Sequence, residues 1–231
     1  MTYEDENTNQ LLRELPKIAE NQWLRERMYD FLKVLQKYRA AIREMTTKLE
    51  VLDDEFSVQH HHNPIHHIES RLKSAESITA KLKKNGFPLT LESLQENLTD
   101  IAGVRVICCY IDDIYRLSDM LLRQTDIELI AKKDYIRDPK PNGYRSLHLV
   151  VRLPIFLSEK TVYVPVEVQI RTVAMDFWAS LEHSLRYKPQ EEIPNGIDAE
   201  LLDCSERVAE LDRQMQAIFR RIQQARRETD V

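Results

Sequence analysis

Apolar residues recur at alternating steps of three and four near both ends of the chain. Toward the N-terminus this seam consists of Met28, Phe31, Leu35, Tyr38, Ile42, Met45, Leu49 and Leu52. Toward the C-terminus it consists of Leu201, Cys204, Val208, Leu211, Met215, Ile218 and Ile222. Narrow seams of this kind are typical of long helices that pack along one side. We therefore predict two long terminal helices that pack on each other or on the core, and we expect them also to pair with another chain.

Between these helices, from about residue 65 to residue 188, helical periodicity alternates with strand periodicity. The pattern predicts helices over 68–84, 91–98, 114–124 and 173–187, and strands over 104–110, 127–133, 144–153 and 161–171. Asn85 and Gly86 mark the end of the first of these helices, since glycine commonly terminates a helix. Because some strands are joined by helices and others directly, we expect a mixed sheet flanked by helices, in the α/β or α+β class.

Composition narrows the class of protein. The 231 residues are 42% hydrophobic and 31% charged, and the three cysteines show no disulfide or zinc spacing, so we expect free thiols in a reducing cytoplasm. No apolar run approaches the length of a membrane span, and the acidic start over residues 1–6 is unlike a signal peptide. A net charge of −5 does not favour nonspecific nucleic-acid binding, so RNA binding is not indicated.

The chain contains only four glycines, and their placement excludes two familiar nucleotide sites. Neither G-x-G-x-x-G nor G-x-x-x-x-G-K-[ST] is present, so there is neither a Rossmann fingerprint nor a P-loop. Any phosphate must then be held mainly by side chains. Lys73, Ser77 and Lys81 recur at steps of four with Arg71 just ahead, which suits a polyphosphate but is also typical of a solvated helix face.

Polar side chains alternate with apolar ones along the strand predicted over 161–171. Glu167, Gln169 and Arg171 share one face of it, and Ser146 and His148 share one face of the neighbouring strand. A polar row on a single strand is usually only solvated. Two adjacent strands with the same alternation predict a common polar surface.

Asp100 stands where a helix ends and the strand over 104–110 begins. A single aspartate at such a position is often a turn residue. Together with Glu167, however, it supplies two hard oxygen ligands, which Mg²⁺ prefers alongside waters and substrate phosphates. The two carboxylates are therefore a candidate Mg²⁺ site.

The most distinctive segment runs from Lys133 to His148. Two prolines stiffen it, and we expect Gly143 to adopt a backbone conformation that only glycine adopts readily. Tyr144 follows this glycine directly, a position suited to stacking on a nucleobase, which contributes roughly 1–3 kcal/mol per base in single-strand binders. Core packing of this tyrosine is the lesser alternative.

Six motifs occur together in the chain. They are E-S-R-x-K over 69–73, D-I-A-G-V-R over 100–105, K-D-Y-I over 133–136, P-N-G-Y-R-S-L-H over 141–148, E-V-Q-I-R-T over 167–172 and W-A-S-L-E-H over 178–183. Together they resemble the synthetase domain of the RelA/SpoT family, over roughly residues 49–188. In length and around residues 53–67 the chain is similar to the small alarmone synthetases, in particular the RelP/YwaC branch. The resemblance implies a nucleotidyltransferase-like synthetase fold with long terminal helices.

The resemblance also implies an activity and a set of site residues. Members of the family transfer pyrophosphate from ATP to the 3′-oxygen of GDP or GTP, which releases AMP and forms (p)ppGpp. Asp100 and Glu167 would be the catalytic pair and would bind Mg²⁺, and Glu167 would also accept the 3′-hydroxyl proton. The residues implied for ATP are Arg71, Lys73, Ser77, Lys81 and Arg105, with the two arginines flanking adenine. The residues implied for GDP or GTP are Lys133, Lys140, Asn142, Tyr144, His148, Gln169 and Asp176, with the tyrosine stacking on guanine.

Asp176 and Glu182 lie near the end of the region that carries the resemblance. Some relatives carry asparagine where Asp176 stands. A carboxylate can accept from both the N1–H and the exocyclic amine of guanine, so we hypothesise that Asp176 selects guanine, because unpaired polar groups can discriminate by roughly 10⁴-fold. Glu182 belongs to a matching motif without an assigned role.

Three regions are expected along the chain: an N-terminal helical region over 1–60, a (p)ppGpp synthetase domain over 61–190 and a C-terminal oligomerisation helix over 191–231. Related small synthetases form tetramers through their terminal helices, so the resemblance implies a homotetramer. The sequence contains no His-Asp dipeptide, and we expect synthesis without hydrolysis.

Two other functions stay open on the residues alone. Another kind of nucleotidyltransferase would need a cluster of carboxylates for two metals, and only Asp100 and Glu167 are convincing. A non-catalytic RNA-binding oligomer would need neither carboxylate. The histidine-rich stretch over 60–67 could bind a transition metal, although the family tolerates histidines there without one.

Overall fold

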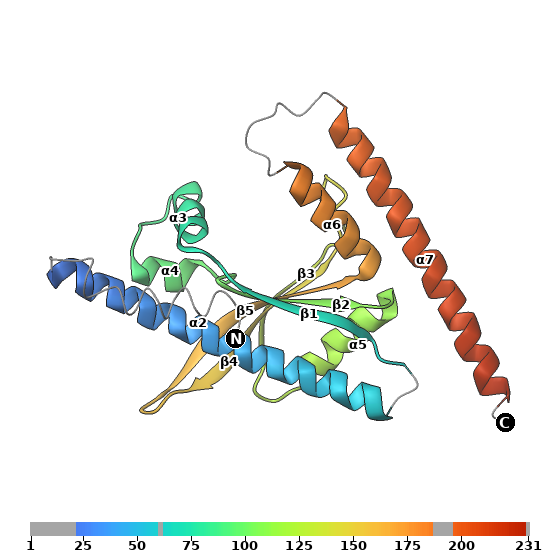
Figure 1. The fold of residues 1–231 in the computed structure, drawn as a ribbon, viewed down its shortest axis with the longest axis horizontal. Helices are drawn as coiled ribbons and strands as arrows, with labels where there is room; N and C mark the ends of the chain where they lie inside the picture. Colours follow the sequence, from blue (N-terminus) through green and yellow to red (C-terminus); the bar gives the residue numbers. More distant parts are fainter. Residues whose placement is uncertain (1–21, 60–61, 187–195, 230–231) are drawn as a thin grey trace.

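The computed structural model describes residues 22–59, 62–186 and 196–229. The helices are α2 (Gln22–Gln59), α3 (Ala75–Lys84), α4 (Leu91–Asn97), α5 (Ile111–Leu122), α6 (Val173–Arg186) and α7 (Ile197–Thr229). The strands are β1 (Ile65–Leu72), β2 (Ala102–Cys108), β3 (Glu128–Asp134), β4 (Leu147–Phe156) and β5 (Thr161–Thr172). Figure 1 shows α2 and α5 on one side of the sheet, α3 and α6 on the other, and α7 as a long helix beside α6.

The five strands form one sheet in the order β1-β2-β5-β4-β3. β2 and β5 run parallel, and every other neighbouring pair runs antiparallel. The mixed sheet that the sequence predicts is therefore confirmed. The parallel pair lies at the centre, so the residues at the start of β2 and along β5 are surrounded by structure on both sides.

One face of the sheet is apolar and forms the core. Val104 pairs with Val168, which pairs with Leu149, so the three side chains share a face, and all three are buried. The predicted N-terminal seam packs on this face, with Met45 and Leu49 fully buried. An apolar face covered by two helices leaves the opposite face of the strands to polar side chains.

The helix predicted over 68–84 is wrong in its first half. Ile65–Leu72 form β1, which pairs antiparallel with β2, and α3 begins only at Ala75, capped by the side chain of Ser74. β1 is an edge strand that is exposed at most positions, so it lacks the clean alternation of β5. Smaller differences occur at element ends, since α5 begins at Ile111 and β4 at Leu147.

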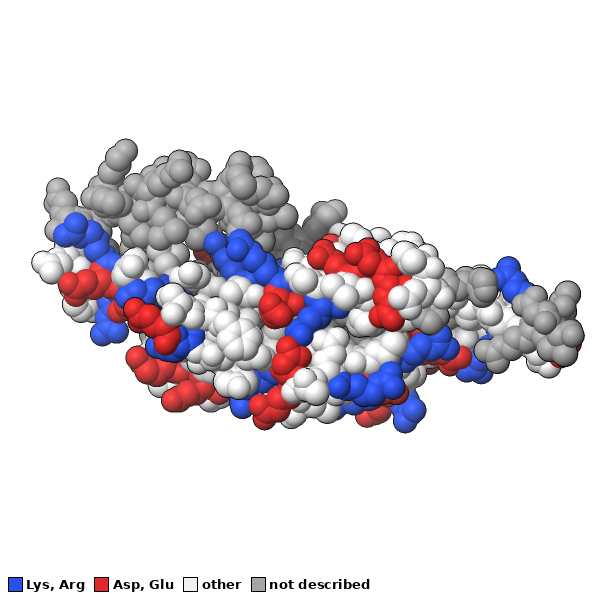
Figure 2. Space-filling model, turned by 90° about the horizontal axis from the view of Figure 1, so that it is seen from below, with Lys and Arg blue, Asp and Glu red and all other residues white. Residues whose placement is uncertain are grey.

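The surface carries charges of both signs. On the face shown in Figure 2, Lys and Arg side chains are interspersed with Asp and Glu among the residues that are described. This mixture agrees with the net charge of −5. Among the described helices, none combines the length and the apolar character that a membrane span requires.

Candidate active site

The polar face of the sheet is built by strand register. Glu69, Arg105, Gln169, His148 and Lys133 are register partners in one row that crosses all five strands. Residues two positions away along each strand lie on the same face. The neighbouring row therefore carries Arg71 on β1 and Glu167 on β5, with Gly103 between them. The common polar surface that alternation predicts on β4 and β5 is confirmed, and it extends to β1, β2 and β3.

Asp100 lies two residues before β2 and is held by two lysines. Lys73 Nζ donates to its Oδ2 at 2.5 Å, and Lys81 Nζ donates to the same oxygen at 2.6 Å. Burial acts to raise the pKa of Asp100, but the hydrogen bonds and charges of the two lysines outweigh burial and lower this pKa. The other oxygen, Oδ1, is buried and has no hydrogen-bond partner. Asp100 is therefore an ionised carboxylate with one oxygen available to a further ligand.

Glu167 lies near the centre of the polar face. Its oxygens accept from His148 Nδ1 at 3.2 Å and from Gln169 Nε2 at 2.8 Å. Burial acts to raise the pKa of Glu167, but these two hydrogen bonds outweigh it, and the pKa is lowered to about 2. The positive charge of Lys81 contributes to this lowering. One ammonium group thus acts on both carboxylates that the sequence singles out.

A closed ring of hydrogen bonds joins five side chains on this face. Arg171 Nη2 donates to Tyr144 Oη at 2.6 Å and to Gln169 Oε1 at 3.0 Å, and Tyr144 Oη lies 2.8 Å from His148 Nε2. Because the carboxylate of Glu167 only accepts, His148 Nδ1 must donate to it, and when Nε2 carries no proton this atom accepts from the tyrosine hydroxyl. Each contact in the ring then has one donor and one acceptor. The ring holds the tyrosine and the histidine in fixed orientations beside Glu167.

Arg171 is a further active-site residue to which the sequence analysis assigns no role. It is 5% exposed, and its Nη1 donates to Asp176 Oδ1 at 3.0 Å. The same oxygen lies 3.5 Å from Nη1 of Arg105, which also donates to Glu69 at 3.0 Å. Alternation along β5 places Arg171 on the polar face, but it does not reveal these partners. Asp176 therefore links Arg105, which is expected on the ATP side, to Arg171 and the ring of hydrogen bonds that includes Tyr144.

The loop before β4 brings several of the expected guanosine residues together. Gly143 has a φ of 89°, which confirms the expected glycine conformation. Lys140 Nζ lies 4.6 Å from the centre of the Tyr144 ring. Asn142 Nδ2 donates to Glu182 Oε1 at 3.1 Å, which ties the loop to α6 and gives this glutamate a contact within the site.

The residues expected for ATP lie toward β1 and α3. Arg71 and Arg105 line an open pocket at the β1 side of the sheet, together with Gly103. Gln169, which is expected for the guanosine nucleotide, lines the same pocket. Ser77 is exposed in the first turn of α3, four residues before Lys81. On the opposite edge of the sheet, Lys133 is exposed on β3.

The histidine-rich stretch is only partly described, because residues 60 and 61 lie outside the described ranges. His62 Nε2 lies 2.8 Å from Asp113 Oδ2, and its ring packs against Phe219 of α7. Within the described ranges, no cluster of three or more side chains is arranged to hold a metal ion. A metal at Asp100 and Glu167 would need further ligands from substrate and water.

Comparisons with known proteins agree with this geometry. A family model described as "Region found in RelA / SpoT proteins" matches residues 70–192. GTP pyrophosphokinase YwaC from Bacillus subtilis (strain 168) is 43% identical over 195 residues, which cover 84% of this chain and 93% of that protein. The crystal structure of small alarmone synthetase 1 from Bacillus subtilis bound to its product pppGpp matches with a TM-score of 0.78 and 36% identity, over 84% of this chain and 98% of that chain. The same synthetase bound to AMPCPP matches with a TM-score of 0.72 and 32% identity, over 84% and 98% of the two chains.

The fold, the motifs and these matches define the class of protein. The chain belongs to the RelA/SpoT family. Within that family it is a small alarmone synthetase, a GTP pyrophosphokinase that makes (p)ppGpp. Pyrophosphokinases of this family generally need a divalent metal.

Proposed function

We propose that the polar face of the sheet is where pyrophosphate passes from ATP to the 3′-oxygen of GDP or GTP. ATP would lie toward β1 and α3, and the guanosine nucleotide toward β4 and the loop before it. The observation that carries this proposal is that Lys81 acts on both Asp100 and Glu167. Arg71 and Arg105, expected for ATP, lie at the β1 side of the sheet, and His148, expected for the guanosine nucleotide, contacts Glu167 from β4. Solved relatives bound to pppGpp and to AMPCPP, an ATP analogue, support it.

Asp100 and Glu167 fit a Mg²⁺ ion. Both pKa values are lowered, so both carboxylates are ionised at neutral pH, and Asp100 Oδ1 is buried without a partner. Two carboxylates with waters and substrate phosphates are a typical Mg²⁺ environment. When bound, the ion would neutralise phosphate charge and draw electron density from the attacked phosphorus.

The chain's own residues would align the two substrates. When ATP binds, Lys73 and Lys81 would contact its phosphates in place of Asp100, and Ser77 would lie beside them. Arg71 and Arg105 would flank the adenine. Lys133, Lys140, Asn142, His148 and Gln169 would hold the guanosine nucleotide, with Tyr144 stacked on guanine and Asp176 reading its edge.

The reaction moves one pyrophosphate group and one proton. The 3′-oxygen forms a bond to the β-phosphorus of ATP, the bond from this phosphorus to the α–β bridging oxygen breaks, and AMP leaves. The hydroxyl proton would pass to Glu167. A pKa of about 2 makes this carboxylate a weak base, but a loose phosphoryl-type transition state depends mainly on alignment and charge neutralisation.

Assembly would use the terminal helices. Leu211, Met215, Ile218 and Ile222 follow one side of α7 and are 47–57% exposed. We expect this apolar side to pair with another copy of the chain, as in a homotetramer, with residues 61–190 as the synthetase domain, 1–60 as a helical region and 191–231 as the oligomerisation helix. Light scattering on a Leu211→Asp/Ile218→Asp variant should show a smaller species, and an unchanged mass would refute the pairing.

The reaction is tested by incubating the protein with ATP, GTP and Mg²⁺ and identifying the products. AMP together with a guanosine 3′-diphosphate supports the proposal, whereas pyrophosphate release indicates another nucleotidyltransferase and absence of turnover favours a binding module. Asp100→Asn and Glu167→Gln should each abolish turnover and leave the circular dichroism spectrum unchanged. Near-normal activity in either variant would remove that residue from the metal site.

A further inference from the structure

α7 contacts the rest of the chain through a polar seam. Ser205, Asp212 and Gln216 are each 4–5% exposed, and Ala209 lies between them on the same side of the helix. The apolar side of α7 faces away from this contact and is half exposed. Burying polar side chains is unfavourable unless each finds a hydrogen-bond partner. The hydrogen-bond partners of these polar side chains therefore contribute to the position of α7.

Ser205 is bonded to the loop that carries Tyr144. Its Oγ donates to the carbonyl oxygen of Gly143 at 2.5 Å and accepts from Arg145 Nη1 at 2.6 Å. A Cβ on Gly143 would lie 2.6 Å from Ser205 Cβ, so the helix and the loop approach as closely as a glycine allows. The two contacts flank Tyr144 on both sides along the chain.

Asp212 is bonded to the junction between β5 and α6. Its Oδ2 accepts from Thr172 Oγ1 at 2.6 Å, and the same threonine oxygen accepts from the backbone N–H of Met175 at 3.1 Å. This chain of bonds caps the first turn of α6, where Asp176 is the next residue. Asp212 thus acts on the turn that presents Asp176 to Arg171.

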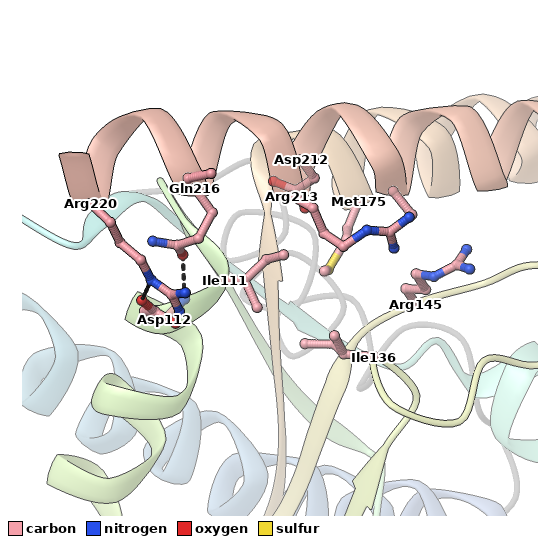
Figure 3. Close-up of a pocket in the computed structure, with 11 residues that line it drawn as sticks. Ile111, Asp112, Ile136, Arg145, Met175, Asp212, Arg213, Gln216 and Arg220 are labelled. Carbon is pink, nitrogen blue, oxygen red and sulfur yellow. Dashed lines mark hydrogen bonds and ion pairs between the residues drawn. The ribbon is translucent and has the colours of Figure 1, made fainter. Parts of the chain in front are cut away.

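The seam does not sit in a packed apolar interface. It borders a cavity of about 400 Å³ between α7, the start of α5 and the segment around Arg145 (Figure 3). Gln216 and Arg220 reach across to Asp112 at the start of α5 (Figure 3). Phe219, further along α7, stacks on Tyr110. Beside Ser205 and Asp212, however, apolar packing is incomplete, so their hydrogen bonds carry a large share of the local attachment.

We propose that α7 positions the guanosine subsite, with Ser205 and Asp212 as its positioning residues. Ser205 would hold the loop that presents Tyr144, and Asp212, through Thr172, would hold the turn that presents Asp176. Both act through other residues. This inference rests on the proposed placement of GDP or GTP beside the loop. It predicts that Ser205 acts on the guanosine side alone, whereas Asp212 also acts weakly on the ATP side, because Asp176 contacts Arg105.

The test is a comparison of KM values in the full-length protein. Loss of an ordinary hydrogen bond changes an equilibrium constant by a factor of about five. Ser205→Ala should therefore raise the KM for GDP or GTP at least about fivefold, because a smaller fraction of the molecules holds the loop in the conformation that binds the nucleotide. The KM for ATP should stay within about twofold in Ser205→Ala. Asp212→Ala should show the same rise in the KM for GDP or GTP and a smaller rise in the KM for ATP, because Asp176 also contacts Arg105.

Two further variants separate positioning from general damage. Cys204→Ala changes an exposed neighbour of Ser205 on α7 and should leave both KM values unchanged. Asp212→Asn keeps an oxygen that accepts from Thr172, and it should restore most of the affinity that Asp212→Ala loses. A circular dichroism spectrum and a melting temperature like those of the wild type show that each variant is folded.

Two results would overturn the inference. One is an unchanged KM for GDP or GTP in both alanine variants. The other is an equal rise in both KM values, which would indicate that α7 only stabilises the fold. A wild-type protein that forms no guanosine 3′-diphosphate would instead refute the proposed function, so the two failures are distinguishable.

Discussion

Glu167→Gln should remove the part of the free energy of unfolding that depends on ionisation of Glu167 and therefore on pH. In the folded chain burial opposes ionisation of Glu167, yet the hydrogen bonds from His148 and Gln169 lower its pKa from 4.5 to about 2. At 1.36 kcal/mol per pKa unit, this difference corresponds to about 3 kcal/mol in favour of the folded state at neutral pH. The side chain is only 19% exposed, so screening by solvent reduces this figure modestly.

The direction of the effect follows from the lowered pKa. The stabilisation is complete above the unfolded-state pKa near 4.5 and is lost as the pH falls through the folded-state pKa near 2. With these two values, about 2 kcal/mol should already be lost at pH 3. The amide introduced by Glu167→Gln does not titrate, so the free energy of unfolding of the variant should fall less steeply with acid.

Urea unfolding of the wild-type protein and Glu167→Gln at pH values from 6 to 3 measures this difference. Protein concentration is held constant, because any assembly would make stability concentration-dependent. Glu159→Gln, at an exposed position in the turn between β4 and β5, should follow the wild-type pH dependence. If the gap between wild type and Glu167→Gln changes by less than about 0.5 kcal/mol over this range, the hydrogen bonds do not hold an ionised Glu167 as inferred.

Three substitutions test other parts of the site. Asp176→Ala should lower the preference for guanosine over adenosine acceptors, measured as a ratio of kcat/KM values, and an unchanged ratio would refute its role in base selection. Tyr144→Ala should raise the KM for GDP or GTP by about 5- to 100-fold, while Tyr144→Phe keeps the stacking ring and should lie closer to wild type; equal values in all three proteins would contradict stacking. Gly143→Ala combines a φ of 89° with a 2.6 Å approach to Ser205 Cβ and should destabilise the fold by about 2–3 kcal/mol, which an unchanged melting temperature would disprove.

The polar face could be predicted wherever alternation is clean. β5 has buried valine and isoleucine on one side, so the opposite side of Glu167 and Gln169 follows from strand geometry alone. The same reasoning places His148 on β4, and the register then sets it beside Gln169. Register itself is a long-range property, which is why the ring through Arg171 and Tyr144 could not be read from spacing.

β1 could not be predicted for a related reason. As an edge strand it is exposed at most positions, so it has neither a continuous apolar run nor a strict alternation. Its strand conformation comes from pairing with β2, which lies about 30 residues or more further along the chain. Arg71 is therefore on a strand beside Gly103, and Lys73 lies between β1 and α3 rather than on the predicted helix face. Lys73 and Lys81 nevertheless converge on Asp100.

α7 shows the limit of periodicity most clearly. The apolar seam that indicates a helix is correct, but residues such as Leu211 and Ile218 lie on the exposed side, and the buried side carries Ser205 and Asp212. Periodicity predicts that a helix has an apolar side and a polar side, but it does not predict which of them packs against the rest of the chain. That depends on the groups that the opposing surface presents. Here that surface offers the carbonyl oxygen of Gly143 and the hydroxyl group of Thr172, and the polar side of α7 supplies hydrogen-bond partners for both. The polar side of α7 can therefore hold the loop within one chain while the apolar side is left for another copy.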